Sequence, residues 1–153
     1  MMKTLSIIQP WATLIATGEK RIETRSWATK YRGPLLIHSS KKIEKFICDK
    51  EPFYSTLHSN GIDSFEKLPI GAIIARCNLV DCLKIIDWEL GDNLRIIGAT
   101  LENDQKVSGN EVEFGNYCLE RYAWILEDVE ILKEPIPAKG KLNLWNFRGE
   151  IET

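Results

Sequence analysis

The chain has 153 residues, of which 44% are hydrophobic and 27% are charged, a composition that is ordinary for one soluble globular domain. Its 20 Lys and Arg side chains are balanced by 22 Asp and Glu side chains, for a formal net charge of −2. This balance excludes the global positive field of non-specific duplex binders, so any contact with nucleic acid must be local. We expect a single domain over residues 1–153.

The N-terminal part predicts two short elements and an extended segment. Residues 5–8 predict a strand, which ends before Pro10 because proline has no donor for a sheet. Residues 11–17 predict a short helix that Gly18 closes. Residues 21–27 predict an extended segment that carries most of the chemistry discussed below.

The middle of the chain predicts a strand, a helix and a second strand. Residues 35–38 are typical of a buried strand. Ser39 and Ser40 are suitable caps for a helix over residues 41–50, whose apolar positions recur at helical spacing. Residues 62–67 indicate another short helix.

The C-terminal half predicts further strands. A long strand runs from Ala72 to about Ile86, whereas residues 87–115 predict little beyond loops. Residues 122–126 and 134–137 are extended, and residues 140–147 close the chain. The sequence therefore predicts an α+β fold with a curled, barrel-like mixed β-sheet and flanking helices.

Several site classes find no support in the sequence. The four cysteines form no CxxC pair and no Cys/His cluster at zinc spacing, so we expect free, buried or half-buried thiols and no metal or cofactor. No stretch approaches the roughly 20 apolar residues of a membrane helix, and no secretory signal is apparent. We expect a cytoplasmic monomer with no membrane partner.

The most informative run is Gln9-Pro10-Trp11 followed by residues 18–27. Strand alternation places Glu23, Arg25 and Trp27 on one face, with Lys20 reaching that face from the preceding turn. Arg25 suits an anionic or carbonyl oxygen, Glu23 a ring N–H or amino group, and Lys20 acts as a mobile cation. The alternative is an exposed cluster of ion pairs with no ligand.

Two aromatic residues and an amide flank this run. Trp11 and Trp27 would stack on a base or belong to the core, and we expect at least one of them to line a cleft. The Gln9 amide would read a base edge or satisfy a backbone carbonyl. For Trp11, Trp27 and Gln9, the ligand role and the structural role both stay open.

A second candidate site follows the buried strand. His38, Ser39 and Lys41 would surround the N-terminus of the predicted helix, where free N–H groups bind anions such as phosphate. The alternative interpretation is that His38 is a hydrogen-bonded, half-buried histidine and that Ser39 is an ordinary helix cap.

Five motifs together resemble the ASCH domain family of the PUA-like superfamily. In chain order they are Leu5-Ser6-x-x-Gln9-Pro10-Trp11, Gly18-x-Lys20-x-x-Glu23-x-Arg25-Ser26-Trp27, Arg32-Gly33-Pro34-Leu35-x-Ile37-His38, Leu68-Pro69-x-Gly71-Ala72-Ile73-Ile74 and Pro135-x-Pro137-x-x-Gly140-x-Leu142-x-Leu144-Trp145. The resemblance implies a β-barrel-like core with helices around a cleft that binds RNA or a nucleotide-like ligand. The domain also occurs in transcription coactivators.

Some members of this family resemble amidohydrolases that act on acylated cytidine through a lysine and a threonine. The present chain keeps the lysine as Lys20 but has Glu23 where the threonine would fall, and Thr24 is one position too late. A hydrolase would instead need Glu23 as general base and Lys20 as oxyanion stabiliser.

The leading hypothesis is therefore an RNA- or nucleotide-binding protein that recognises a single-stranded or modified nucleotide. A hydrolase of a modified nucleoside or of RNA is the alternative. A protein-interaction module in transcription or translation is the second alternative.

Overall fold

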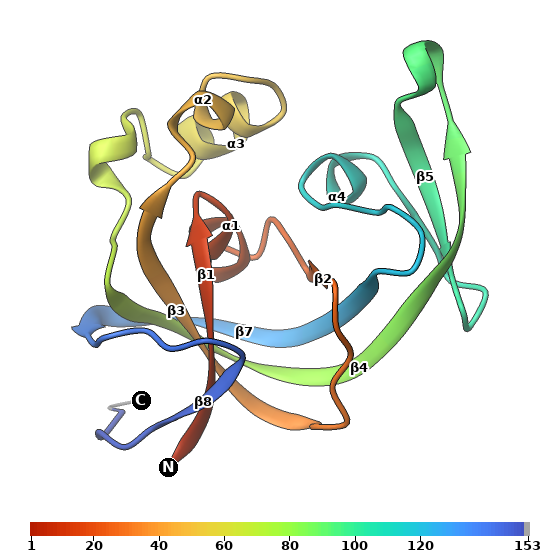
Figure 1. Cartoon of the computed structure of the whole chain (residues 1–153). Helices are drawn as coiled ribbons and strands as arrows, with labels where there is room; N and C mark the ends of the chain where they lie inside the picture. The colour runs from red at the N-terminus through yellow and green to blue at the C-terminus, as the bar shows by residue number, and fades with distance from the viewer. Residues whose placement is uncertain (152–153) are drawn as a thin grey trace. The chain divides into compact units, whose positions relative to one another are not determined.

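The computed structural model describes residues 1–151 and confirms the predicted α+β class. Within these residues, strands of both orientations form an eight-stranded mixed sheet accompanied by helices (Figure 1). The strands are β1 (Met2–Gln9), β2 (Ile22–Arg25), β3 (Gly33–Ile43), β4 (Ala72–Leu90), β5 (Ile96–Leu101), β6 (Lys106–Ser108), β7 (Tyr122–Pro137) and β8 (Leu144–Phe147). The helices are α1 (Trp11–Ala16), α2 (Lys45–Cys48), α3 (Phe53–Ser59) and α4 (Asn110–Glu113), with 3-10 turns η1 (Phe65–Lys67) and η2 (Asp92–Leu94).

The strand order is β2-β7-β4-β3-β1-β8, with β5 beside β4 and β6 beside β5. The chain groups into two compact units. The first unit comprises residues 1–19, residues 34–78 and the chain from Asp128 onward, and the second unit comprises residues 20–33 and 79–127. The single domain over residues 1–153 stays a prediction.

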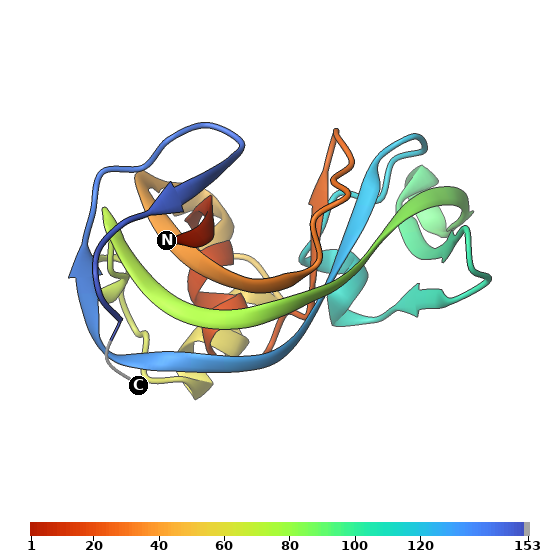
Figure 2. The ribbon, with the colours of Figure 1, turned by 90° about the horizontal axis from the view of Figure 1, so that it is seen from below.

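The first unit is built around β1, which is parallel to β3 and antiparallel to β8. In Figure 2, β3 (orange) and the first part of β4 (yellow-green) run alongside each other. Helix α1 packs against β1 and buries Ala12 through Ala16, so it is held by its apolar surface. Gly18 follows with φ +82°, the left-handed conformation that the predicted helix end requires. The predicted elements over residues 5–8 and 11–17 are thereby confirmed.

Of the helix predicted over residues 41–50, only Lys45–Cys48 (α2) is helical, and the prediction is wrong for the residues before it. Strand β3 continues to Ile43, which pairs with Gln9 of β1, and the amide of Glu44 donates to the carbonyl of Gln9 at 2.9 Å. This pairing holds the segment extended, because sheet hydrogen bonds override a local helical pattern. Phe46, which the helical spacing assigned to a buried face, is 84% exposed.

A second helix, α3, which the sequence did not predict, follows α2. In α3, Phe53 and Leu57 are buried at i and i+4 spacing. Helices α2 and α3 contact each other (Figure 1). Of the short helix predicted over residues 62–67, only the turn η1 forms.

The second unit is built around β2, β4, β5 and β7. Strand β2 pairs antiparallel with β7, and β4 forms a hairpin with β5, which pairs with β6. Ile22, Leu101, Val107, Tyr117 and other buried residues form its core. Residues 87–115, for which the sequence predicted little beyond loops, contain β5, β6 and α4. The extended segments predicted over residues 122–126 and 134–137 belong to one continuous strand, β7.

No helix within residues 1–151 is long and apolar enough to cross a membrane, and no three metal-ligating side chains gather there. The four cysteines are free. Cys48, Cys77 and Cys82 are buried or half-buried as predicted, but Cys118 is exposed, so that prediction is wrong for one thiol.

Candidate functional site

In the second unit, the Glu23 carboxylate lies between two cations. Its Oε1 is 3.1 Å from Nζ of Lys20, and its Oε2 is 3.2 Å from the guanidinium of Arg25. The Lys20 side chain has no exposed surface, the Glu23 side chain is 10% exposed and the Arg25 side chain is 25% exposed. We call these three residues the Glu23 cluster. It has two positive charges to one negative charge, and Arg25 is its most accessible member.

Strand β2 brings the cluster together. Glu23 pairs with Trp124 of β7 and Arg25 with Tyr122, so alternation sets both side chains on one face. Lys20 precedes the strand and reaches Glu23 from the turn, as the sequence predicted. Its ammonium also donates to the carbonyl of Ile22. Lys20 is therefore a fixed cation, and the expectation that it is mobile is wrong.

Glu111 of α4 holds the backbone just before β2. Its carboxylate accepts hydrogen bonds from the amide of Arg21 at 2.7 Å and the amide of Ile22 at 3.3 Å. Burial raises the pKa of Glu111. The two hydrogen bonds and the charge of Lys20 lower this pKa, but the effect of burial is larger. Glu111 is thus a carboxylate that fixes the turn carrying Lys20.

The segment after α4 holds the strand itself. The amide of Asn116 donates to Oγ1 of Thr24 at 2.9 Å, and the guanidinium of Arg121 donates to the carbonyl of Thr24 at 3.3 Å. Sequence reasoning missed Glu111, Asn116 and Arg121. No local signal links them to β2, because they lie about 90 residues further along the chain.

Trp27 lies at the end of the same run. Its ring meets that of Trp124 edge to face, with centroids 4.8 Å apart and planes at 85°, and its carbonyl accepts the indole N–H of Trp124 at 3.2 Å. Trp124 is fully buried, whereas Trp27 is half-buried. Packing therefore orients Trp27 while part of its surface stays accessible.

Gln9 and Trp11 belong to the first unit. The Gln9 amide nitrogen donates to Thr13 and to the carbonyl of Pro69, each at 2.7 Å, and its oxygen accepts the amide of Thr13 at 2.9 Å. Gln9 is fully buried, so it has the role in backbone satisfaction that the sequence left as an alternative. Trp11 is half-buried and packs edge to face on Phe53, with ring centroids 5.8 Å apart.

The predicted anion site at residues 38–41 lacks its helix. His38, Ser39 and Lys41 all lie in β3, whose backbone N–H groups belong to a strand, so the expectation of a helix N-terminus there is wrong. The Ser39 hydroxyl is buried and donates to the carbonyl of Ala72 at 3.1 Å. Lys41 is exposed, and its aliphatic stem lies over Gly71.

His38 occupies a directed chain of hydrogen bonds. Its Nε2 is 2.8 Å from the carbonyl of Ala138, which only accepts, so Nε2 carries the proton. Nδ1 then accepts from the Ser6 hydroxyl at 2.9 Å, while the Trp145 indole donates to the same hydroxyl at 3.0 Å. Burial lowers the pKa of His38. His38 is a hydrogen-bonded, buried histidine, one of the two roles that the sequence allowed.

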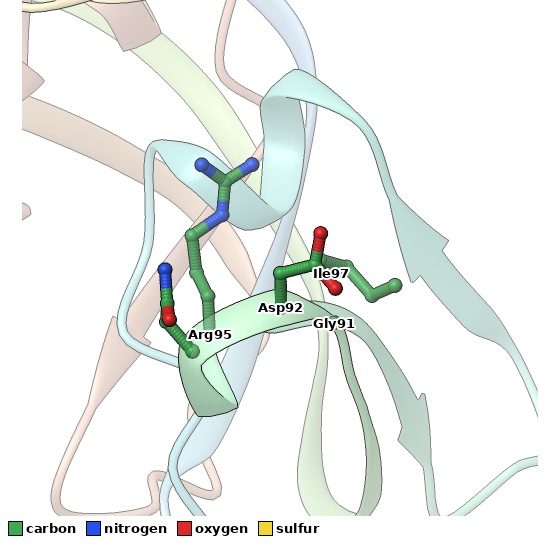
Figure 3. A pocket seen from close by; sticks show the side chains of 5 residues that line it. Gly91, Asp92, Arg95 and Ile97 are labelled. Atoms are coloured by element: carbon green, nitrogen blue, oxygen red, sulfur yellow. The ribbon is translucent and has the colours of Figure 1, made fainter.

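Figure 3 shows a surface hollow in the second unit that involves none of the predicted residues. Asp92, Arg95 and Ile97 line it at the tip of the β4–β5 hairpin. The Arg95 guanidinium is 2.8 Å from the carboxylate of Glu113, so that protein carboxylate already neutralises it.

The ASCH domain family matches residues 5–135 of this sequence. The chain belongs to the ASCH domain family. This membership confirms the resemblance drawn from the five motifs, and the open strand order agrees with a curled, PUA-like mixed sheet.

Two curated relatives are similar to part of the chain. Activating signal cointegrator 1 from Homo sapiens is 35% identical over 81 residues, and the protein of the same name from Mus musculus has the same identity over the same length. Each match covers 52% of this chain and 14% of the relative, so the chain matches only a small part of either protein.

Proposed function

We propose that this ASCH domain binds single-stranded RNA or a modified nucleotide through the Glu23 cluster and Trp27. The observation that carries the proposal is the position of Glu23, buried between a fixed lysine and a partly exposed arginine. Glutamate accepts the N–H groups of a base, and arginine donates to phosphate or carbonyl oxygens. Both kinds of group therefore lie within one short strand.

The charge distribution supports a single strand over a duplex. With a net charge of −2, the chain has no overall positive field for a duplex, whereas one or two local cations suffice for a splayed strand. Lys20 helps by compensating the charge of Glu23 from the protein side. The Arg25 guanidinium can then turn its exposed part to an oxygen of the ligand.

Trp27 supplies the apolar surface that base recognition needs. Base stacking on an aromatic ring contributes about 1–3 kcal/mol per base. The edge-to-face contact with Trp124 fixes the Trp27 ring before a ligand arrives, which lowers the entropy cost of binding. Gln9, Trp11, His38, Ser39 and Lys41 remain predicted ligand residues, but the proposal does not depend on them.

Calorimetric titration of the wild type with short oligo(U), oligo(C) and oligo(A), and with modified cytidines, tests the proposal. We expect saturable binding, weakened roughly tenfold or more in Arg25→Ala because a charge-assisted hydrogen bond contributes about 1.5–3 kcal/mol. Arg95→Ala is the matched control, since Arg95 is also an ion-paired arginine of the second unit. Equal affinities in wild type and Arg25→Ala would contradict the proposal.

Mass spectrometry of the same mixtures separates the alternatives. An unchanged ligand mass supports a binding domain. A new product that disappears in Glu23→Gln would instead make the protein a hydrolase. No binding to any ligand would favour a protein-interaction module.

A further inference from the structure

Tyr117 is a buried phenol beside the Glu23 cluster that the motifs do not include. It is 2% exposed, and its hydroxyl has no hydrogen-bond partner within residues 1–151. A buried hydroxyl without a partner lowers stability, so such a group calls for an explanation, and a bound ligand is one that fits its place beside the Glu23 cluster.

Two contacts made by residues just before Tyr117 hold its segment against β2. Six residues before it, Glu111 binds the amides of Arg21 and Ile22, and one residue before it, Asn116 binds Thr24. Tyr117 shares a core cluster with Ile22. Its ring lies against the backbone of Gly115, since a Cβ added to that glycine would come within 2.6 Å of the ring. The phenol therefore has little freedom to seek another partner.

The surroundings of the hydroxyl are acidic. Burial raises the pKa of Tyr117, and the charges of Glu111 and Glu23 raise it further, so the phenol keeps its proton at neutral pH. The group is thus a donor that lies near the Glu23 carboxylate, which is an acceptor. A donor beside an acceptor matches the edge of a nucleobase, where an N–H lies next to a ring nitrogen or a carbonyl oxygen.

We propose that Tyr117 is a specificity-determining residue whose hydroxyl donates a hydrogen bond to the bound base while Glu23 accepts a base N–H. This inference rests on the proposed function. Exposure falls from Arg25 through Glu23 to Tyr117, which is the order in which the proposed base edge would meet them. Its ligand class is a single-stranded nucleotide with an unpaired base.

Tyr117→Phe tests the inference because it removes only the hydroxyl. We expect the affinity for short oligo(U), oligo(C) or oligo(A) to fall about three- to tenfold for at least one base, as for the loss of one neutral hydrogen bond. The affinity for an abasic strand of equal length should not change. The melting temperature should stay the same or rise, because the variant loses a buried group without a partner.

Tyr54→Phe is the matched control, since Tyr54 is an exposed tyrosine of the first unit. Unchanged affinity of Tyr117→Phe for all three base-bearing strands would overturn the inference. So would a melting temperature lowered by several degrees with no loss specific to base-bearing strands, since the hydroxyl would then be structural. If Arg25→Ala also leaves every affinity unchanged, the proposed function itself fails; if only Arg25→Ala weakens binding, the role of Tyr117 alone fails.

Discussion

The ammonium of Lys20, which has no exposed surface, lies 3.1 Å from the carboxylate of Glu23. Removing one partner of a buried ion pair leaves the other charge uncompensated. We expect Glu23→Ala to lower the free energy of unfolding by about 3 kcal/mol, measured by urea denaturation. The exposed pair Lys42–Glu44, with its atoms 3.0 Å apart, is the control, and Glu44→Ala should cost at most about 1 kcal/mol. Equal losses in the two variants would contradict the buried pairing.

Arg25 should set the salt dependence of binding. If its guanidinium contacts a phosphate, each such contact releases counterions when a single strand binds. We expect the negative slope of log K against log salt concentration for oligo(U) to be shallow in the wild type, and its magnitude to be smaller by about 0.7 in Arg25→Ala. Parallel slopes for the two proteins would assign Arg25 to a base oxygen instead.

Gly140 is packed against the hydrogen bond between Ser6 and His38. A Cβ at this position would lie 2.7 Å from Cε1 of His38 and 2.9 Å from the Ser6 hydroxyl. We expect Gly140→Ala to lower the free energy of unfolding by about 1–3 kcal/mol, because overpacking displaces well-fitted groups. The neighbouring exposed Lys139 provides the control, and Lys139→Ala should leave stability nearly unchanged. A stable Gly140→Ala variant would mean that the loop yields easily.

His38 should make the protein less stable at acidic pH. Burial lowers its pKa below 6.5, so below about that pH the unfolded chain binds a proton that the folded chain does not. The contribution of His38 to the free energy of unfolding is therefore full at neutral pH and falls as the pH drops below about 6.5. In His38→Gln, which cannot titrate, this part of the pH slope should disappear, whereas His58→Gln at an exposed site should keep it. Identical pH profiles for wild type and His38→Gln would refute the assignment.

Glu111 should have the opposite pH dependence. Its folded-state pKa is raised above 4.5, so between that pH and the raised pKa the folded chain binds the proton more tightly than the unfolded chain. Relative to Glu111→Gln, the wild type should lose stability as the pH rises from about 4.5 to neutral. Denaturation of both proteins at the two pH values measures this. Glu102→Gln is the matched control, because Glu102 is exposed and also accepts a backbone N–H. A wild type that gains stability over this range relative to Glu111→Gln would show that hydrogen bonds to Arg21 and Ile22 outweigh burial.

Local signals predicted the elements that depend on local physics. Pro10 and a left-handed Gly18 defined the first strand and helix, and strand alternation placed Glu23 beside Arg25. The first part of the helix predicted over residues 41–50 failed because β1 pairs with β3 as far as Ile43, which no short window reveals.

The remainder of the candidate site lay beyond local signals. Tyr117 and Glu111 lie in a segment of short elements with little regular pattern, and their contacts to β2 span about 90 residues. The buried side chains of Gln9 and His38 likewise form hydrogen bonds with carbonyls that are distant in sequence, those of Pro69 and Ala138. For both residues the sequence offered a structural role and a ligand role, and the partners of the structural role lie too far along the chain for a local pattern to show them.

The long separation between β2 and the residues that hold it has a consequence for biosynthesis. A chain grows from its N-terminus, so residues 20–27 leave the ribosome well before Glu111, Asn116 and the β7 partner strand have been made. Until then Lys20 and Arg25 are solvated and Trp27 has no Trp124 to orient it. A nascent or truncated chain that stops before residue 110 therefore carries the whole motif but lacks the ties that arrange it. The Glu23 cluster therefore takes its folded arrangement only after residue 124 has been made.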